Sequence, residues 1–512
     1  MATFLIGIDV GTTGSKALLI GADGSVRASA TAEYPMFTPQ PLWAEQRPAD
    51  WWAATVTSIR RVLDEGGVQP GQVAGVGLTG QMHGLVLLDA QGRVLRPCIM
   101  WNDQRTAAQC AAITASVGAE QVLRLTGNPV LPGFTAPKIV WVREHEPEAY
   151  ARVAKVLLPK DYVRYCLTGG FFSEVSDASG TSLFDVGRRQ WSAEMLEALE
   201  LPRQWLPEVT ESPVVSAHVS ARAAAETGLL AGTPVVGGGG DQAAQAVGTG
   251  IVAEGVVSAT LGTSGVVFAA SETYRVEPQG RLHAFCHAAP GMWHLMGVML
   301  SAGGSFRWYR DVLGAPERAL ARQSGRDPYD VLTEAAAQVP AGCEGLLFLP
   351  YLSGERTPHP DPNARGVFFG LTLRHTKAHV TRAVLEGVSY GLRDSLELMR
   401  GLGLSIAQVR ASGGGARSDL WRHILADVFG TEIVTVNVTE GAAYGAALLA
   451  GVGAGVYPSV AAACDAGVHV TGRTEPGPAA SVYADYYPRY RALYPALQAE
   501  FEAIAQVVNR HL

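Results

Sequence analysis

Two aspartates stand where a carboxylate could act on a bound substrate, and the stronger candidate is Asp241. It follows four consecutive glycines, Gly237 to Gly240, and precedes an alanine-rich stretch typical of a helix. Glycines leave space for a substrate to approach the backbone, and the first amides of a helix stabilise negative charge. A carboxylate at this place can accept a proton from a hydroxyl group. The alternative interpretation is an aspartate that only caps the helix.

The second candidate, Asp9, lies where an apolar run gives way to a tight polar turn. The segment FLIGIDVGTTGSKALLI predicts two strands joined by this turn. Gly11 and Gly14 are expected to adopt positive φ, so that backbone N–H groups in the turn face an anion. Thr12 and Thr13 would supply those N–H groups.

A metal ion bound to that anion would sit beside Asp9. Mg²⁺ prefers oxygen ligands and keeps several waters, so one carboxylate, nucleotide oxygens and water are enough to hold it. The alternative is an aspartate that bonds its own backbone within the turn. We interpret Lys16, in the second strand, as a solvated side chain.

The turn is repeated in the second half of the chain. Residues 256–270 read VVSATLGTSGVVFAA, with a glycine–threonine turn at Gly262 and Thr263 between two apolar strands. Two matched hairpins predict a duplicated unit whose turns face each other across a cleft. Such a pair of turns could hold a polyphosphate from both sides.

Met82 and His83 lie in a loop between two predicted core strands, residues 73–78 and 85–88. His83 can donate or accept a hydrogen bond with a polyol hydroxyl. A loop histidine that is satisfied within the protein is an equally good interpretation.

The segment PCIMWNDQR combines aromatic and polar side chains, as sugar sites do. Trp101 offers a stacking surface, while Asn102 and Asp103 offer hydrogen-bonding groups. A local ion pair between Asp103 and Arg105 is the alternative.

A second glycine-rich turn contains Gly414 and Gly415 and precedes a predicted helix that begins at Asp419. Its glycines could let an adenosine lie against a strand–helix turn, although a turn of three glycines is more often structural.

Length, composition and net charge limit the classes of protein to which the chain can belong. A chain of 512 residues is too long for one core, so we expect at least two domains, and 47% hydrophobic with 17% charged residues is typical of a well-packed soluble protein. A net charge of −7 without a long basic run argues against a nucleic-acid partner. Without a signal sequence or a long apolar run, we expect a cytoplasmic protein that does not span a membrane.

The six cysteines form no C-x-x-C pair, so we expect them to be reduced. The P-loop, zinc-peptidase and esterase motifs do not occur in the sequence. The proline- and glycine-rich stretch 467–481 is predicted to be irregular, and residues 490–509 are predicted to form a C-terminal helix.

Taken together, these motifs resemble the xylulokinases of the FGGY carbohydrate kinase family. The resemblance covers nearly the whole length and rests on ordered matches. They include IGIDVGTTGSKALL (6–19), GQMHG (80–84), RPCIMWNDQR (96–105), PGFTAPKIVWVREHEPE (132–148), SDASGT (176–181), GGGDQAA (238–244), LGTSG (261–265), FLPYLSGERTPH (348–359) and SGGGARSDLWR (412–422).

The resemblance implies an α/β protein with the two-domain actin, hexokinase and Hsp70 ATPase fold, built from ribonuclease H-like repeats around a central cleft. The expected domains are residues 1–251, which bind the sugar and carry the base, and residues 252–512, which bind ATP. The resemblance also implies ATP with Mg²⁺, D-xylulose as the acceptor, and a homodimer.

Residue roles follow from the same resemblance. The resemblance makes Asp241 the general base and Asp9 the acid that faces the Mg-nucleotide and binds the Mg²⁺ through water. The sugar contacts are Met82, His83, Gln242 and the 101–103 segment. The phosphate contacts are Thr12, Thr13, Gly262 and Thr263, and the adenine-nucleotide site contains Gly303, Gly414, Gly415 and Asp419.

One position departs from the pattern. Xylulokinases commonly have asparagine after the base, whereas Gln242 follows Asp241 here, which is similar to glycerol kinases. The hypothesis is ATP-dependent phosphorylation of the 5-hydroxyl of D-xylulose. The alternatives are a kinase for another polyol or ketose, such as ribulose or glycerol, and an actin- or Hsp70-like protein that uses ATP to switch a binding surface.

Overall fold

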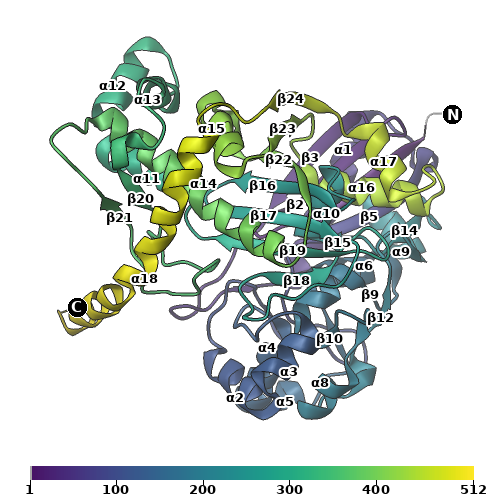
Figure 1. Ribbon diagram of the computed structural model, residues 1–512. Helices are drawn as coiled ribbons and strands as arrows, with labels where there is room; N and C mark the ends of the chain where they lie inside the picture. The colour runs from purple at the N-terminus through teal and green to yellow at the C-terminus, as the bar shows by residue number, and fades with distance from the viewer. Residues whose placement is uncertain (1–2, 512) are drawn as a thin grey trace.

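Two seven-stranded sheets form the frame of the chain in the computed structural model, which describes residues 3–511 (Figure 1). The first sheet has the strand order β13-β14-β5-β1-β2-β3, with β15 also paired to β5. Its strands are β1 (Phe4–Val10), β2 (Gly14–Gly21), β3 (Val26–Glu33), β5 (Val73–Gly80), β13 (Val215–His218), β14 (Pro234–Val236) and β15 (Gly239–Gly240).

The second sheet has the order β18-β19-β17-β16-β22-β23-β24. Its strands are β16 (Gly255–Leu261), β17 (Gly265–Ser271), β18 (His283–Cys286), β19 (Trp293–Met299), β22 (Ile406–Ser412), β23 (Glu432–Val436) and β24 (Val470–Thr474).

Both sheets repeat one topology. β3-β2-β1-β5-β14 in the first sheet corresponds to β19-β17-β16-β22-β23 in the second. In each set a central strand pairs antiparallel with its hairpin partner and parallel with the strand on its other side. The predicted pair of matched hairpins and the duplicated unit are therefore confirmed.

Helices surround the two sheets, and shorter ones form the lower part of Figure 1 around α2 to α5 and α8. The helices of the first half are α1 (Pro48–Gly66), α2 (Ala107–Val117), α3 (Ala119–Thr126), α4 (Thr135–His145), α5 (Pro147–Tyr150), α6 (Pro159–Thr168), α7 (Val175–Ala178), α8 (Ala193–Ala198), α9 (Ala221–Thr227) and α10 (Asp241–Gly248). Those of the second half are α11 (Gly303–Leu313), α12 (Ala315–Ser324), α13 (Pro328–Ala337), α14 (Lys377–Gly401), α15 (Asp419–Phe429), α16 (Gly441–Gly453), α17 (Val460–Gly467) and α18 (Ala480–His511).

Short paired strands complete the chain. They are β4 (Glu45–Gln46), β6 (Val86–Leu88), β7 (Cys98–Ile99), β8 (Lys155–Leu157), β9 (Phe172–Glu174), β10 (Phe184–Asp185), β11 (Gln190–Trp191), β12 (Glu208–Thr210), β20 (Leu347–Leu349) and β21 (Val367–Phe369).

Two predictions near the C-terminus are wrong. The stretch 467–481 is not irregular throughout, because β24 forms within it and pairs antiparallel with β23. Helix α18 begins at Ala480, ten residues before the predicted start, and contains two prolines. Tyr483 and Tyr487, in its first two turns, are buried, so side-chain packing outweighs the local effect of the prolines.

Helix α16, from the second half of the sequence, packs directly on the first sheet. A Cβ on Gly7 in β1 would overlap the backbone oxygen of Ala443, and a Cβ on Gly77 in β5 would overlap that of Ala446. Helix α10 packs on α16 just as closely at Gly445. Small residues therefore join the two halves through backbone contact.

This packing predicts that Gly7→Ala separates α16 from the first sheet. We expect a loss of about 1–3 kcal/mol or more in the free energy of unfolding, because the added methyl group meets backbone rather than a movable side chain. Chemical denaturation would measure the loss. Gly71→Ala is the control, since no atom lies within 4 Å of a Cβ at that position. Equal stability of the two variants would contradict the interpretation.

Candidate active site

Strand register brings Asp9 and Asp241 to the same edge of the first sheet. In the parallel pair β1–β5, Asp9 lies opposite Thr79 and Val10 opposite Gly80. Gly80 is also opposite Gly240 of β15, the residue before Asp241. The two acids are thus about two strand spacings apart, roughly 10 Å. They are separated by 232 positions in the sequence, yet they occupy one site.

The glycine run before Asp241 is required by backbone geometry. Gly238 has φ of 74°, and a Cβ there would overlap the backbone oxygen of Leu78. A Cβ on Gly240 would lie 2.9 Å from the sulfur of Met82. The run therefore lets the turn that carries Asp241 pack against both β5 and the loop of Met82.

Both acids hold protons unusually tightly. Burial, reinforced by the charge of Asp241, raises the pKa of Asp9 to about 7, although Lys16 opposes the shift. Burial raises the pKa of Asp241 to about 6, although hydrogen bonding by Gln242 opposes it. The Gln242 N–H donates to Asp241 Oδ1 over 2.7 Å. A pair of perturbed carboxyl groups at one sheet edge is typical of a functional site.

Asp9 has capacity for a further ligand. Its Oδ1 is enclosed and has no hydrogen-bond partner among residues 3–511. Lys16 lies opposite Asp9 in the hairpin and forms an ion pair with Glu440, the residue before α16. The interpretation of Lys16 as a solvated side chain is therefore wrong, because it is partly buried where the two halves meet.

The turn after Asp9 differs from the prediction in its dihedral angles. Gly11 and Gly14 do not have positive φ. The turn closes through a hydrogen bond from Gly11 N–H to Gly14 O over 3.1 Å, and a Cβ on Gly14 would lie 2.8 Å from Ala32 O. Glycine is needed at position 14 for close approach to β3. Thr12 is half-buried and Thr13 is exposed.

The equivalent turn of the second half meets two other glycine segments. Thr263 O accepts hydrogen bonds from Ala302 N–H and Gly304 N–H, both over 3.0 Å. A Cβ on Gly303 would lie 2.5 Å from Gly262 O. The other segment begins at Gly413, where a Cβ would lie 2.7 Å from Leu261 O of β16.

Gly414 and Gly415 follow Gly413 and begin a short 3₁₀ turn, Gly414–Arg417. No atom lies within 4 Å of a Cβ at Gly414, whereas Gly415 packs on Leu261 and Trp421. The Asp419 side chain is exposed and bonds Arg422 over 2.9 Å. The structure thus brings Gly262, Thr263 and the glycine turn together, while the Asp419 carboxylate is engaged at the start of α15.

The hydrogen bonds of His83 define its tautomer. Its Nδ1 lies 2.6 Å from Gly180 O, and because a carbonyl oxygen only accepts, Nδ1 carries the proton. Burial lowers the pKa of His83 to about 3, so the ring is neutral. Its Nε2 is therefore a hydrogen-bond acceptor. The ring stacks on Phe134, with centroids 4.5 Å apart, which fixes its plane.

Trp101 and Asn102 lie at or near the surface, unlike Asp103. Trp101 is 43% exposed and donates its Nε1–H to Thr12 Oγ1 over 3.1 Å, so it contacts the turn that follows Asp9. Asn102 is half-buried, and its Oδ1 has no partner among the described residues.

Contrary to the prediction, Asp103 is not available for a contact with a sugar. It is fully buried, and its Oδ2 accepts from Ala44 N–H and from Arg105, each over 2.7 Å. Arg105 also lies over the Trp43 ring. Asp103 thus forms the local ion pair that the sequence left as the alternative, and its oxygens are occupied within the protein.

Lys138 supports the His83 loop, although the sequence suggested no role for it. It is fully buried and donates to His83 O over 2.9 Å and to Gly133 O over 2.6 Å. Burial lowers its pKa to about 7. A lysine within the apolar segment APKIVWV was the available signal, because lysine is almost never fully buried without a specific partner.

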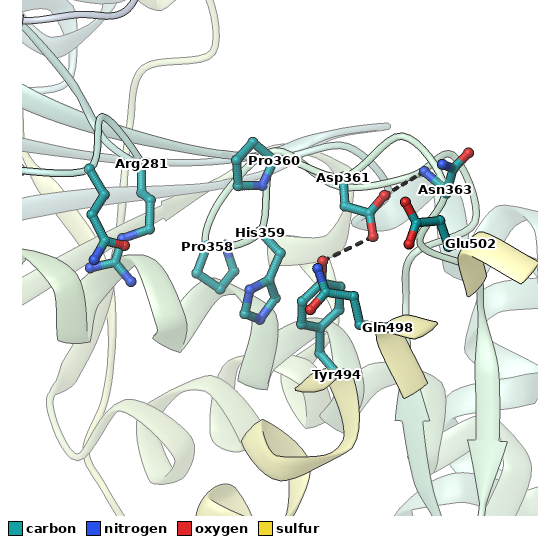
Figure 2. A pocket seen from close by; sticks show the side chains of 10 residues that line it. Arg281, Pro358, His359, Pro360, Asp361, Asn363, Tyr494, Gln498 and Glu502 are labelled. Atoms are coloured by element: carbon teal, nitrogen blue, oxygen red, sulfur yellow. Dashed lines mark hydrogen bonds between the residues drawn. The ribbon is translucent and has the colours of Figure 1, made fainter. Parts of the chain in front are cut away.

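A separate hollow of about 480 Å³ lies between α18 and the loop that follows β20 (Figure 2). His359 stacks on Tyr494, whose hydroxyl donates to Asp361 Oδ2 over 2.9 Å. Arg281 also lines it. Every residue of this lining belongs to the second half of the chain, and none contacts Asp9 or Asp241 in the hydrogen bonds described.

Comparison with known proteins agrees with this geometry. The model of the FGGY family of carbohydrate kinases, N-terminal domain, matches residues 4–248, and that of its C-terminal domain matches residues 257–454. The chain belongs to the FGGY family of carbohydrate kinases. The predicted two-domain α/β kinase fold is confirmed with it.

Individual FGGY relatives cover almost the whole chain. A xylulose kinase of Escherichia coli is 44% identical over 496 residues, covering 96% of this chain and 99% of the relative. The crystal structure of a xylulose kinase from Rhodospirillum rubrum superposes with a TM-score of 0.91 at 33% identity, covering 98% and 100% of the two chains. A gluconokinase of Bacillus subtilis is 32% identical over 451 residues, covering 88% and 87%.

Two further expectations concern the cysteines and membrane-spanning helices. All six cysteines are free of disulfide bonds. Among residues 3–511, no helix is both long and apolar enough to cross a membrane.

The raised pKa of Asp9 predicts a gain in stability for Asp9→Asn. Between about pH 4 and pH 7 the folded protein binds this proton more tightly than the unfolded chain, so wild-type stability falls as the pH rises through that range. The asparagine variant is neutral throughout. Its thermal midpoint relative to wild type should therefore rise from pH 4 to pH 7 and stay constant above.

Thermal unfolding without nucleotide measures this difference. Asp23→Asn is the control: hydrogen bonds from Ser25 lower the pKa of the exposed Asp23, so this group titrates below about pH 4 and its stability difference should stay constant from pH 4 to pH 7. A stability difference for Asp9→Asn that does not change with pH would contradict the burial of an unpaired carboxylate.

Proposed function

We propose that the protein phosphorylates the 5-hydroxyl of D-xylulose with ATP as donor, giving D-xylulose 5-phosphate. The observation that carries the proposal is the meeting of Asp241, Asp9 and the Met82–His83 loop at one sheet edge. The high identity to a xylulose kinase supports the choice of sugar.

Asp241 is the proposed general base. Its raised pKa makes it a better proton acceptor than an ordinary aspartate while leaving it largely ionised at neutral pH. The fixed tautomer of His83 supports a role in sugar binding, since Nε2 can accept a hydrogen bond from a hydroxyl group. Lys138 holds the backbone of this histidine.

Asp9 fits the acid that faces a Mg-nucleotide. Its enclosed, unpartnered Oδ1 suits a water of the Mg²⁺ shell, and oxygen is the ligand type that Mg²⁺ prefers. When bound, Mg²⁺ neutralises the charge that develops on the nucleotide phosphates. The two glycine–threonine turns supply backbone N–H groups to the phosphates, and the glycine segments around Gly303 and Gly414 supply the space for the nucleoside.

A kinase for another polyol, ketose or sugar acid is the second candidate. Gln242 departs from the asparagine common in xylulokinases at the position next to the base, to which its backbone N–H donates, and a gluconokinase is among the relatives. A protein that uses ATP only to switch a binding surface is less well supported, because it has no need of a sugar histidine with a fixed tautomer. The domain division at residues 251 and 252, the homodimer and the cytoplasmic location stay predictions.

Removal of the base should abolish most of the activity. We expect Asp241→Asn to lower kcat by about 10²–10⁴-fold, the usual contribution of a general base. In the wild type, kcat should fall as the pH drops below about 6, because protonation removes the accepting carboxylate. A pH series with coupled ADP detection measures both. A variant with near-wild-type turnover would remove Asp241 from the mechanism.

A sugar panel tests the acceptor. We expect the highest kcat/KM for D-xylulose among xylulose, ribulose, glycerol and gluconate, and ADP release that depends on the sugar. Gln242→Asn should change the KM for the sugar by about 10-fold or more, since the side chain neighbours the base, with the KM for ATP nearly unchanged. Another acceptor with a higher kcat/KM would replace xylulose in the proposal.

A further inference from the structure

A buried polar segment, Glu174 to Gly180, lies behind both the proposed base and the sugar histidine. It comprises the end of β9, helix α7 and the 3₁₀ turn Ser179–Thr181. Within residues 174–180 every residue is buried. The segment contains most of the motif SDASGT (176–181), for which the sequence alone suggested no role.

The first contact of this segment is with the base-bearing turn. Strand β15 pairs with β5 alone, so its other edge needs a hydrogen-bond partner. Gly240 N–H donates to Ser176 Oγ over 3.0 Å, in the residue just before Asp241. Ser176 therefore replaces a neighbouring strand at the point where the backbone turns to present the base.

The Ser176 hydroxyl is itself held in place. Its proton is donated to the carboxylate of Glu174, whose oxygens lie 2.9 Å away. Glu174 also accepts from the N–H groups of Ser176 and Asp177, over 2.8 Å and 2.7 Å, and from Ser212 Oγ over 3.0 Å. This leaves the Ser176 oxygen oriented to accept from Gly240.

Glu174 shares one buried cation, Lys160, with two other buried acids. Lys160 Nζ lies 3.7 Å from Glu174 and 3.4 Å from Asp177, and 2.9 Å from Asp161, all of them fully buried. Such a network is fixed in one arrangement because loss of any partner leaves an uncompensated buried charge. It is therefore a rigid support rather than a mobile one.

The second contact is with the sugar histidine. Gly180 O accepts the Nδ1 proton of His83, and a Cβ on Gly180 would lie 2.5 Å from that nitrogen. Ser179 Oγ accepts from Cys286 N–H of β18 over 3.1 Å, which ties the same segment to the second half. One rigid segment thus locates the base, the sugar histidine and a strand of the second sheet.

We propose that Ser176 is a positioning residue for catalysis: it holds Gly240 N–H so that the carboxylate of Asp241 meets the acceptor hydroxyl. The inference rests on the proposed role of Asp241 as the base. A misplacement of about 1 Å at a reacting group can lower the rate about 10²-fold, so loss of this hydrogen bond affects turnover more than binding.

Ser176→Ala tests the inference, with Ser212→Ala as the matched control. Both serines are fully buried or nearly so and both donate to Glu174, but the hydroxyl of Ser212 does not contact Gly240. We expect Ser176→Ala to lower kcat by about 10- to 100-fold with the KM values for sugar and ATP changed less than about threefold. Ser212→Ala should lower the thermal midpoint similarly but keep kcat within about threefold of wild type.

A second pair of variants guards against loss of folding. Ser176→Thr and Ser176→Val add the same bulk, but only threonine keeps an oxygen that can accept from Gly240. Turnover of the threonine variant should exceed that of the valine variant at least about tenfold. Equal turnover of this pair, or equal losses in the two alanine variants, would overturn the inference.

The assay uses whichever sugar gives wild-type turnover in the panel. If wild type phosphorylates a sugar other than xylulose, the choice of substrate fails while the serine comparison is still measured. If Asp241→Asn keeps activity, the base assignment fails independently of Ser176.

Discussion

The parallel pairing of β1, β5 and β15 is the constraint on which the site depends. It sets Asp9 and the residue before Asp241 in neighbouring rows of one sheet, although the two acids come from opposite ends of the N-terminal domain. Parallel strands end at the same edge, so the polar residues that follow them gather there. The site needs the two distant segments to pair in this register, because a shift by one residue would turn Asp9 to the other face.

Close backbone contact supports that register on every side. Gly238 lies against β5, Gly7 and Gly77 lie against α16, and Gly240 lies against the Met82 loop. Side chains at these positions would push the layers apart, and the two halves of the chain could not share the edge. The glycines therefore serve packing as much as access for ligands, and Lys16 with Glu440 adds a charged link between the halves beside Asp9.

The sequence predicted the hairpins, the duplication and the two acids because each leaves a local pattern: alternating apolar strands, a glycine–threonine turn, and a glycine run before an acid. It did not predict that Gly11 and Gly14 lack positive φ, because the glycine at position 14 is needed for close contact with Ala32 of the neighbouring strand β3, and that contact leaves no local pattern. Asp103 was predicted to contact the sugar because its buried partner Ala44 is distant in the sequence.

The sequence suggested no role for Lys138 or for the Glu174–Gly180 segment, because their contacts with the site are long-range. Lys138 is 55 residues from His83 in the sequence, Ser176 is 64 residues from Gly240, and Gly180 is 97 residues from His83. A buried lysine or a serine inside a polar motif reveals its role only when the partner backbone group is known. Beta strand β24 and the early start of α18 were missed through tertiary contacts of the same kind.

The central claim is that the two acids direct phosphoryl transfer from ATP to a sugar hydroxyl. ³¹P nuclear magnetic resonance of a reaction with ATP, Mg²⁺ and ¹³C-labelled D-xylulose tests it most directly. The account predicts a new phosphomonoester coupled to C5 of the sugar, formed in step with ADP and absent with Asp241→Asn. Release of inorganic phosphate with no sugar phosphate would contradict it.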